Sequence, residues 1–204
     1  LNVINNQQLT FSGSGTSAGT ALITNNNGPL FFGSTANAGT STIGNVGTGT
    51  VNFQGSSSAS MATINNSGTG NINFYTTAKG GSAMITNTGA GNINVQGSAD
   101  LENATVTLTN GSLDVFGGAT AGTSTLNLGG TGNHFFSDTS SAGTAIITHN
   151  GTGSLLFTDD ATANGATIQT TAANALVFQL NARAGTANIT NGASANLLFA
   201  NDSS

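Results

Sequence analysis

The order of apolar and polar residues repeats about every twenty-one positions along the whole chain. Within each repeat, two short segments alternate between apolar and polar positions. The first segment places a small residue two positions before an isoleucine, as in Ala21 and Ile23, and the second places an aliphatic residue two positions before a phenylalanine, as in Leu30 and Phe32. Alternation with a period of two predicts β-strands that bury one face. Each repeat is therefore expected to hold two strands.

The inward positions of successive repeats define two apolar columns. The phenylalanine column holds Phe11, Phe32, Phe53, Phe74, Phe136, Phe157, Phe178 and Phe199, with Val95 and Val115 in the two repeats that lack the ring. The isoleucine column holds Ile23, Ile43, Ile64, Ile85, Ile147, Ile168 and Ile189. Self-similarity at such a period is typical of stacked repeats. We therefore predict an all-β parallel solenoid of about ten coils of 20–21 residues, with these columns as its core.

The segments between the predicted strands are rich in glycine and asparagine, which suit tight corners. A third short strand is expected in the Gly-, Ser- and Thr-rich stretch that precedes each new repeat. No window shows apolar residues at helical spacing, and glycine and threonine are poor helix formers. Stacked strands lie about 4.8 Å apart, so the array predicts a rod on the order of 45 Å long. Residues 1–204 are interpreted as one solenoid domain.

An asparagine recurs two residues after the buried isoleucine, where the chain must turn. The column consists of Asn25, Asn45, Asn66, Asn87 and Asn191. Asparagine accepts left-handed backbone geometry, and stacked side-chain amides can bond to one another along a column. The position predicts an internal amide ladder, with ordinary solvated turn residues as the alternative.

The near absence of charge narrows the classes of function. Lys79 and Arg183 are the only lysine and arginine, against seven carboxylates, and the chain has no cysteine. Binding to nucleic acid or to an anionic membrane surface needs several cations, so neither partner is expected. A thiolate metal site and disulfides are excluded. No segment has eighteen consecutive apolar residues, so no membrane-spanning helix and no direct membrane contact are predicted.

The chain begins and ends within the repeat pattern. Repeat arrays normally carry polar caps over their terminal faces. We therefore expect a segment of a longer array or a subunit that stacks on its neighbours, with partners that are either adjoining segments of the same chain or other copies joined end to end.

The repeat core Ala-Gly-Thr-Ala-x-Ile-Thr-x-x-Gly-x-Gly-x-Leu-x-Phe, present in 142–157, resembles the repeats of bacterial autotransporter passengers and related large surface proteins. The resemblance extends over essentially all of the chain. It implies a right-handed parallel β-helix that is exported and displayed on the bacterial cell surface or released. It brings no catalytic motif, because none is visible in these residues.

Three acidic residues, Asp138, Asp159 and Asp160, form the sharpest constellation. The first two occupy the same coil position one repeat apart and are expected to lie close together. Polysaccharide hydrolases with a β-helix fold use similar carboxylates as acid and base, but the Gly-His-Gly and Arg-x-Lys elements that accompany them are missing here. A weak calcium site is a second possibility, since calcium prefers carboxylate oxygens. The third is an acidic surface edge, and we predict no catalytic residue, no metal site and no cofactor.

Two histidines and several threonines complete the candidates. His134 stands where other repeats have Leu or Val, and His149 stands in the asparagine column, so the sequence places them at different corners of adjacent coils. A partial threonine array could form an ice-binding face; its pairs are Thr20/Thr24, Thr40/Thr42, Thr105/Thr107, Thr123/Thr125, Thr144/Thr148 and Thr186/Thr190.

The sequence therefore predicts a non-enzymatic structural solenoid, a stalk or fibre segment of an adhesin-like bacterial surface protein. Its partners would be its own neighbours and, at most, surface glycans or other cells. The alternative is a carbohydrate-active or carbohydrate-binding β-helix that uses the edge around Asp138, Asp159 and Asp160. Ice binding through a threonine face is a further alternative.

Overall fold

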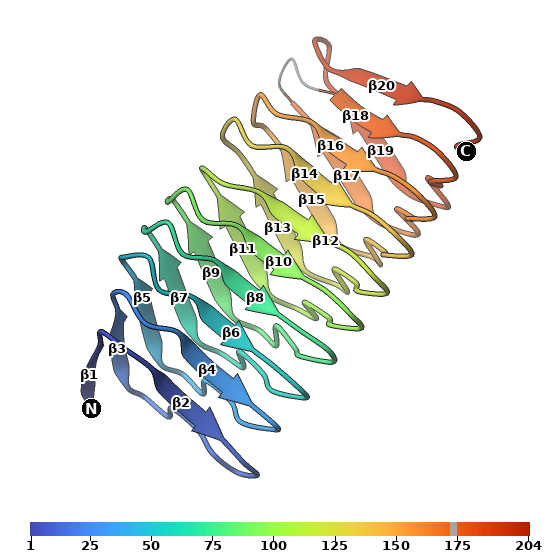
Figure 1. Cartoon of the computed structure of the whole chain (residues 1–204). Coiled ribbons are helices and arrows are strands. Elements are labelled where there is room, and N and C mark those ends of the chain that lie inside the picture. Colours follow the sequence, from blue (N-terminus) through green and yellow to red (C-terminus); the bar gives the residue numbers. More distant parts are fainter. Residues whose placement is uncertain (172–174) are drawn as a thin grey trace.

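The computed structural model describes residues 1–171 and 175–204, and within them it contains twenty β-strands and no helix (Figure 1). The strands belong to two parallel sheets of ten. The first sheet holds β1 (Asn2–Asn5), β3 (Leu22–Asn25), β5 (Thr42–Asn45), β7 (Thr63–Asn66), β9 (Met84–Asn87), β11 (Thr105–Leu108), β13 (Thr125–Leu128), β15 (Ile146–His149), β17 (Thr167–Thr170) and β19 (Asn188–Asn191). The second holds β2 (Leu9–Ser12), β4 (Leu30–Gly33), β6 (Val51–Phe53), β8 (Ile72–Phe74), β10 (Ile93–Val95), β12 (Leu113–Val115), β14 (His134–Phe136), β16 (Leu155–Phe157), β18 (Ala175–Phe178) and β20 (Asn196–Phe199).

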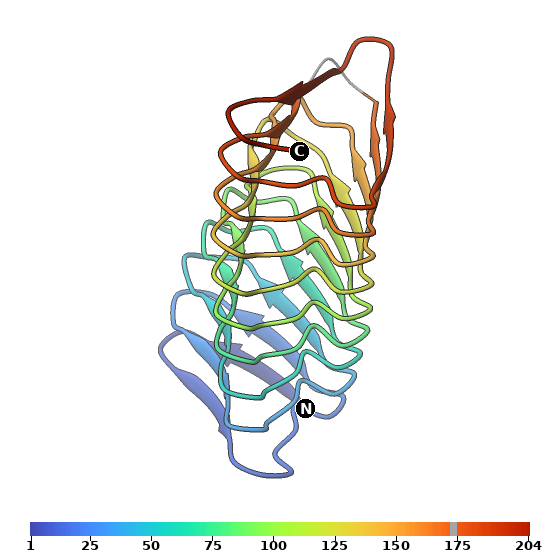
Figure 2. The same ribbon diagram turned by 90° about the vertical axis from the view of Figure 1, so that its right-hand side faces the viewer.

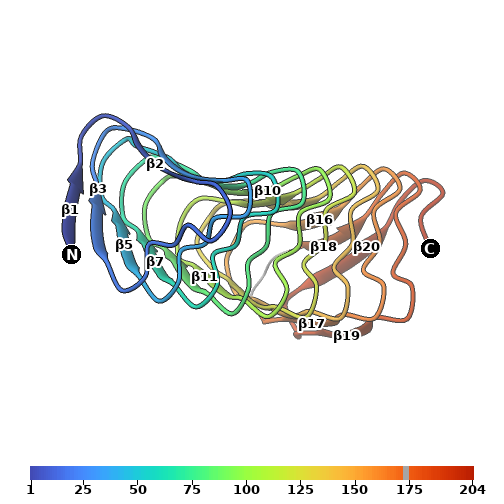
Figure 3. The ribbon, with the colours of Figure 1, turned by 90° about the horizontal axis from the view of Figure 1, so that it is seen from below.

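The chain winds between the two sheets, so that each strand pairs with the equivalent strand of the next coil rather than with its neighbour in sequence. Figures 2 and 3 show the coils following one another along the axis, with the two termini at opposite ends of the stack. The predicted all-β solenoid is confirmed. The expected third strand is a column of single-residue parallel bridges that runs from Ser17 to Arg183.

The phenylalanine column forms two stacks of parallel rings in the core. Centroids of successive rings lie 4.9 Å apart between Phe32 and Phe53 and again between Phe53 and Phe74. The second stack runs from Phe136 to Phe199, and Val95 and Val115 separate the two stacks. This spacing equals the distance between stacked strands, so each of these coils contributes one ring at the equivalent position along the stack.

Burial of the core columns decreases in the terminal coils. The rings from Phe32 to Phe178 are fully buried, whereas Phe11 is half-buried and Phe199 is 44% exposed. In the isoleucine column, all members are buried except Ile189, which is half-buried. The reason is geometric, because a residue of a terminal coil has a neighbouring coil on one side only.

The asparagine column forms the internal ladder. The side-chain Nδ2 of Asn25 donates to Oδ1 of Asn45 at 2.7 Å, Asn45 donates to Asn66 at 2.8 Å, and Asn66 donates to Asn87 at 2.6 Å. The ladder starts one coil earlier than the sequence indicated, because Asn5 donates to Asn25 at 2.6 Å. All five asparagines of the ladder, Asn5, Asn25, Asn45, Asn66 and Asn87, are buried, so they are not solvated turn residues.

Asn191 continues the column beyond the ladder. It accepts a hydrogen bond from the Thr170 hydroxyl at 2.5 Å and donates to the carbonyl oxygen of Ala195 at 2.7 Å. Leu108, Leu128, His149 and Thr170 occupy this column between Asn87 and Asn191. The chain of amide-to-amide bonds therefore belongs to the N-terminal half of the rod.

The left-handed corners are not at the ladder asparagines, which corrects the sequence interpretation. Asn25 and its counterparts are the last residues of extended strands. Apart from Gly15, Gly111 and Gly130, the positive φ angles of the described residues lie in two other columns. One lies two residues after the phenylalanine position and includes Ser34 and Asp138, and the other precedes each strand of the first sheet and includes Gly39. At Gly39 (φ 63°) a Cβ would lie 2.7 Å from the carbonyl oxygen of Gly19, so the close stacking of coils requires glycine there.

Candidate functional site

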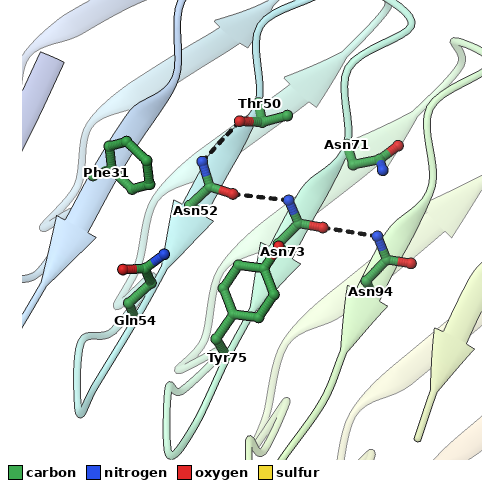
Figure 4. A pocket seen from close by; sticks show the side chains of 8 residues that line it. All are labelled: Phe31, Thr50, Asn52, Gln54, Asn71, Asn73, Tyr75 and Asn94. Carbon is green, nitrogen blue, oxygen red and sulfur yellow. Dashed lines mark hydrogen bonds between the residues drawn. The ribbon is translucent and has the colours of Figure 1, made fainter. Parts of the chain in front are cut away.

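The outer face of the second sheet carries a groove over β4, β6, β8 and β10. We call it the amide groove; it is lined by Phe31, Thr50, Asn52, Gln54, Asn71, Asn73, Tyr75 and Asn94 (Figure 4). The strand alternation explains these positions. Because Phe32, Phe53 and Phe74 point into the core, their preceding residues point outward.

A second amide ladder runs along the floor of the groove. Nδ2 of Asn94 donates to Oδ1 of Asn73 at 2.7 Å, and Asn73 donates to Asn52 at 2.8 Å. Asn52 ends the ladder with a bond of 2.8 Å to the Thr50 hydroxyl. Parallel pairing brings these asparagines into register. Each amide has two N–H donors and two acceptor lone pairs, so the ladder uses only half of the hydrogen-bonding capacity of Asn73.

Two aromatic rings border the amide floor. Figure 4 shows Phe31 at the end nearest β2 and Tyr75 at one side, with Gln54 between them. A second polar hollow adjoins the groove beyond Phe31 and is lined by Gln8, Thr10, Ser12, Phe31, Gly33, Ser34, Gln54 and Gly55. Phe31 and Gln54 border both hollows. The combined surface therefore alternates aromatic faces with amides and hydroxyls.

All lining residues of both hollows are uncharged. The outward column of Asn52, Asn73 and Asn94 continues with a carboxylate, Asp114, which lies opposite Asn94 in the strand register. Its Oδ2 accepts hydrogen bonds from the Ser112 hydroxyl at 2.9 Å and from Asn92 at 3.5 Å. Its Oδ1 is buried and has no hydrogen-bond partner among the described residues. Burial raises the pKa of this carboxyl, and the bond from Ser112 opposes the rise.

The sequence analysis missed the amide groove, although a signal was present. The tripeptides 51–53, 72–74 and 93–95 read Val-Asn-Phe, Ile-Asn-Phe and Ile-Asn-Val, with asparagine at the outward position each time. A polar residue that recurs on the solvent face at the repeat period predicts a row of like side chains.

The structure places the acidic candidates in corners. Asp138 and Asp159 occupy equivalent left-handed turn positions, with φ of 57° and 60°. Oδ2 of Asp138 accepts the backbone N–H of Gly117 at 2.9 Å, and Oδ2 of Asp159 accepts that of Asp138 at 3.3 Å. Oδ1 of Asp160 accepts from the Asn181 amide at 3.3 Å. Each carboxylate thus binds a neighbouring coil, and the described residues contain no group of three His, Cys, Asp or Glu side chains suited to a metal ion.

The two histidines meet, although the sequence placed them at different corners. His134 begins β14 and His149 ends β15 of the following coil, and both side chains are fully buried. Their rings lie edge to face. The last inward position of a first-sheet strand and the first inward position of the following second-sheet strand line the same narrow corner of the coil. Residues at these two positions in adjacent coils therefore contact each other.

Burial lowers the pKa of both histidines to about 4, and His149 adds to the lowering at His134. Nδ1 of His134 accepts the backbone N–H of Leu113 at 3.1 Å. Both rings are therefore uncharged at pH 7, and we assign them a packing role in the core.

The threonine pairs do not form the array that the sequence indicated. Only Thr105 and Thr107 lie within one strand, β11. The first members of the other pairs precede the strands, in corners. Of these, Thr40, Thr123 and Thr186 donate their hydroxyls to carbonyl oxygens of the preceding coil, at 3.4, 3.0 and 3.2 Å. Their hydrogen bonds stabilise the stack.

The outward columns of the first sheet are also mixed in chemistry. One runs Asn2, Leu22, Thr42, Thr63, Met84, Thr105, Thr125, Ile146, Thr167 and Asn188. Leu22, Met84 and Ile146 are all about half exposed, which breaks the hydroxyl row. This column therefore lacks the regular row of threonines that an ice-binding face would need.

Neither a protein-family model, nor a curated protein, nor a solved structure matches the chain. The described residues contain no helix of the length and hydrophobicity that a membrane crossing requires.

Proposed function

We propose that the chain is a non-enzymatic structural solenoid, a stalk or fibre segment of an adhesin-like protein of the bacterial cell surface or extracellular space. The observation that supports it is the continuity of the two sheets: every strand from β1 to β20 pairs in parallel with its equivalent in the neighbouring coil. Continuous ladders make a rod that transmits force along its axis. Projection or linkage by a rigid rod is the corresponding mechanism.

Side-chain stacks reinforce the backbone ladders. The phenylalanine rings, the internal amides and the isoleucines each contact their equivalents above and below. Separating the coil of Phe53 from the coil of Phe74, in the N-terminal half of the rod, breaks all three kinds of contact at once. The near-constant repeat length also leaves no long insertion from which an enzyme's cleft is usually built.

The bacterial origin and the surface location rest on the resemblance of repeats such as 142–157 to those of autotransporter passengers. Scarcity of charge and absence of cysteine agree with it. As partners we propose adjoining segments of the same chain or other copies stacked end to end, and beyond them other cells or their surface glycans.

Force spectroscopy along the axis tests the proposal. With handles at the two ends, we expect the rod to unfold coil by coil, in steps of roughly 70 Å for twenty-one extended residues. Phe53→Ala and Phe74→Ala should lower the unfolding force of the coils around β6 and β8, whereas the outward Thr107→Ala should not. A chain that extends without resistance, or a globular particle in electron micrographs, would contradict a stalk.

The runner-up is a carbohydrate-active edge at Asp138, Asp159 and Asp160. A screen against a panel of polysaccharides, with the wild type and the triple variant D138N/D159N/D160N, separates it from the stalk. We expect no cleavage by either protein. Cleavage by the wild type that disappears in the triple variant would establish the enzyme instead.

A further inference from the structure

We propose that the amide groove and the adjoining hollow beyond Phe31 bind an uncharged polysaccharide. The inference concerns the outer face of the second sheet and is independent of the acidic edge. It rests on the chemistry of the lining, on the arrangement of the rings and on the amides of Gln54, Asn71 and Asn94 that border the rigid ladder.

The lining matches neutral sugars in charge and polarity. Its residues are amides, hydroxyls, glycines and two aromatic rings, all uncharged. Sugar hydroxyls are donors and acceptors, as are Asn, Gln and Thr side chains, so pairing requires no ion to be desolvated. A nucleic acid or an acidic glycan would instead find no cation here.

The rings supply the apolar half of the recognition. The C–H face of a pyranose packs against an aromatic ring, and a buried ring contributes a large apolar area. Phe31 and Tyr75 lie outside the core, on β4 and directly after β8, where such a face can reach them. Phe31 borders both polar hollows, so a sugar stacked on this ring has amide partners in each of them.

The ladder gives the groove a regular, rigid floor. Asn52, Asn73 and Asn94 are fixed by their mutual bonds and spaced one strand apart, about 4.8 Å. A hexose unit in an extended chain is of similar length. Asn52 and Asn73 are only 5% and 4% exposed, so an extended glycan that follows the groove along the rod axis meets the more exposed amides of Gln54, Asn71 and Asn94 beside this floor. The preorganised floor reduces the ordering cost of binding.

The face continues beyond the groove with different chemistry, which provides a matched control. The same outward column that holds Phe31 and Asn73 holds Phe135 on β14 and Leu156 on β16. Phe135 is an outward aromatic residue that borders neither hollow. Its replacement removes a ring from the same sheet without altering the proposed site.

Affinity gel electrophoresis of the full chain tests the proposal, with hydroxyethyl cellulose, mixed-linkage β-glucan or a soluble neutral galactomannan in the gel, and heparin and alginate as charged probes. We expect at least one neutral polymer to retard the wild type. Phe31→Ala and Tyr75→Ala should weaken binding roughly tenfold or more, while Phe135→Ala should bind like the wild type. Circular dichroism checks that each variant is folded.

Three results would overturn the proposal. The first is no retardation of the wild type by any neutral polymer, and the second is retardation by the charged polymers alone. The third is equal retardation of the wild type, Phe31→Ala and Tyr75→Ala, which would place binding elsewhere on the rod.

Discussion

The rings of His134 and His149, from neighbouring coils, lie edge to face inside the core with their centroids 5.4 Å apart. Burial holds the pKa of each at about 4, below the ordinary value of 6.5. The folded protein therefore resists protonation that the unfolded chain accepts.

The histidine pair should make stability depend on pH. Above pH 6.5 neither the folded nor the unfolded chain binds a proton at these two histidines, so their contribution to the stability is fully present. As the pH falls from about 6.5 towards about 4, the unfolded chain takes up protons first, so stability is lost across this window. We expect the loss to be on the order of a few kcal/mol in total, measured by urea unfolding at a series of pH values.

The variant H134L/H149N is the control for that experiment. It installs the residues that the same columns carry in other coils, such as Leu155 and Asn87. We expect its stability to be nearly constant between pH 6.5 and pH 5. An unchanged slope in the double variant would assign the pH dependence to other groups.

Asp114→Asn should stabilise the protein at neutral pH. The new amide can donate to Oδ1 of Asn94 and extend the outer ladder by one coil, while it still accepts from Ser112. Burial raises the pKa of the Asp114 carboxyl in the folded protein. The contribution of Asp114 to stability is therefore fully present below its unfolded pKa of about 4, where the carboxyl is protonated in both states. This contribution is lost as the pH rises through the folded pKa. We expect a gain of about 1 kcal/mol at pH 7 and little at pH 3. Equal stability of the two proteins at pH 7 would contradict the ladder extension.

Replacing buried serines with alanine should also stabilise the rod. Ser41 and Ser124 stand in an inward column that holds alanine in other coils, and their hydroxyls have no hydrogen-bond partner among the described residues. Removal of an unpaired buried hydroxyl should add about 1 kcal/mol per site, read from thermal or urea unfolding. The reverse change, Ala83→Ser, should cost a similar amount; a neutral result in both directions would mean that the hydroxyls are satisfied by water.

Phe74→Asp should abolish the local fold, because it puts an unpaired carboxylate between Phe53 and Val95 in the core column. Tyr75→Asp, at the next residue but facing outward, should cost far less. Circular dichroism and thermal unfolding compare the two. A melting temperature of Phe74→Asp within a degree or two of the wild type would be incompatible with its burial.

The terminal coils should support end-to-end association. Ile4 is 68% exposed in the first coil and Leu198 is 51% exposed in the last, and β1 and β20 present the free edges of their sheets. An exposed parallel edge without charge favours further pairing. We expect sedimentation velocity to show concentration-dependent rods, and Ile4→Lys with Leu198→Lys to shift them to single particles. A wild type that stays monomeric at high concentration would show that the edges are protected.

The sequence by itself determined the solenoid. A period of twenty-one residues with alternating inward positions leaves few arrangements other than stacked coils, because only equivalent residues placed one above another bury the phenylalanine and isoleucine columns together. From the scarcity of charge we likewise expect no partner whose binding needs several cations, such as a nucleic acid. These conclusions depend on pattern and composition, which are properties of the chain alone.

Only the tertiary structure decided which side chains meet between the columns. The contact of His134 with His149 depends on how closely the two sheets approach at one corner, and the left-handed positions at Ser34 and Asp138 depend on the path of the chain around the coil. The amide groove depends on which side chains stand above the sheet and which leave a hollow. Such relations arise from packing across the coil, and a linear period carries no information on distances perpendicular to the axis.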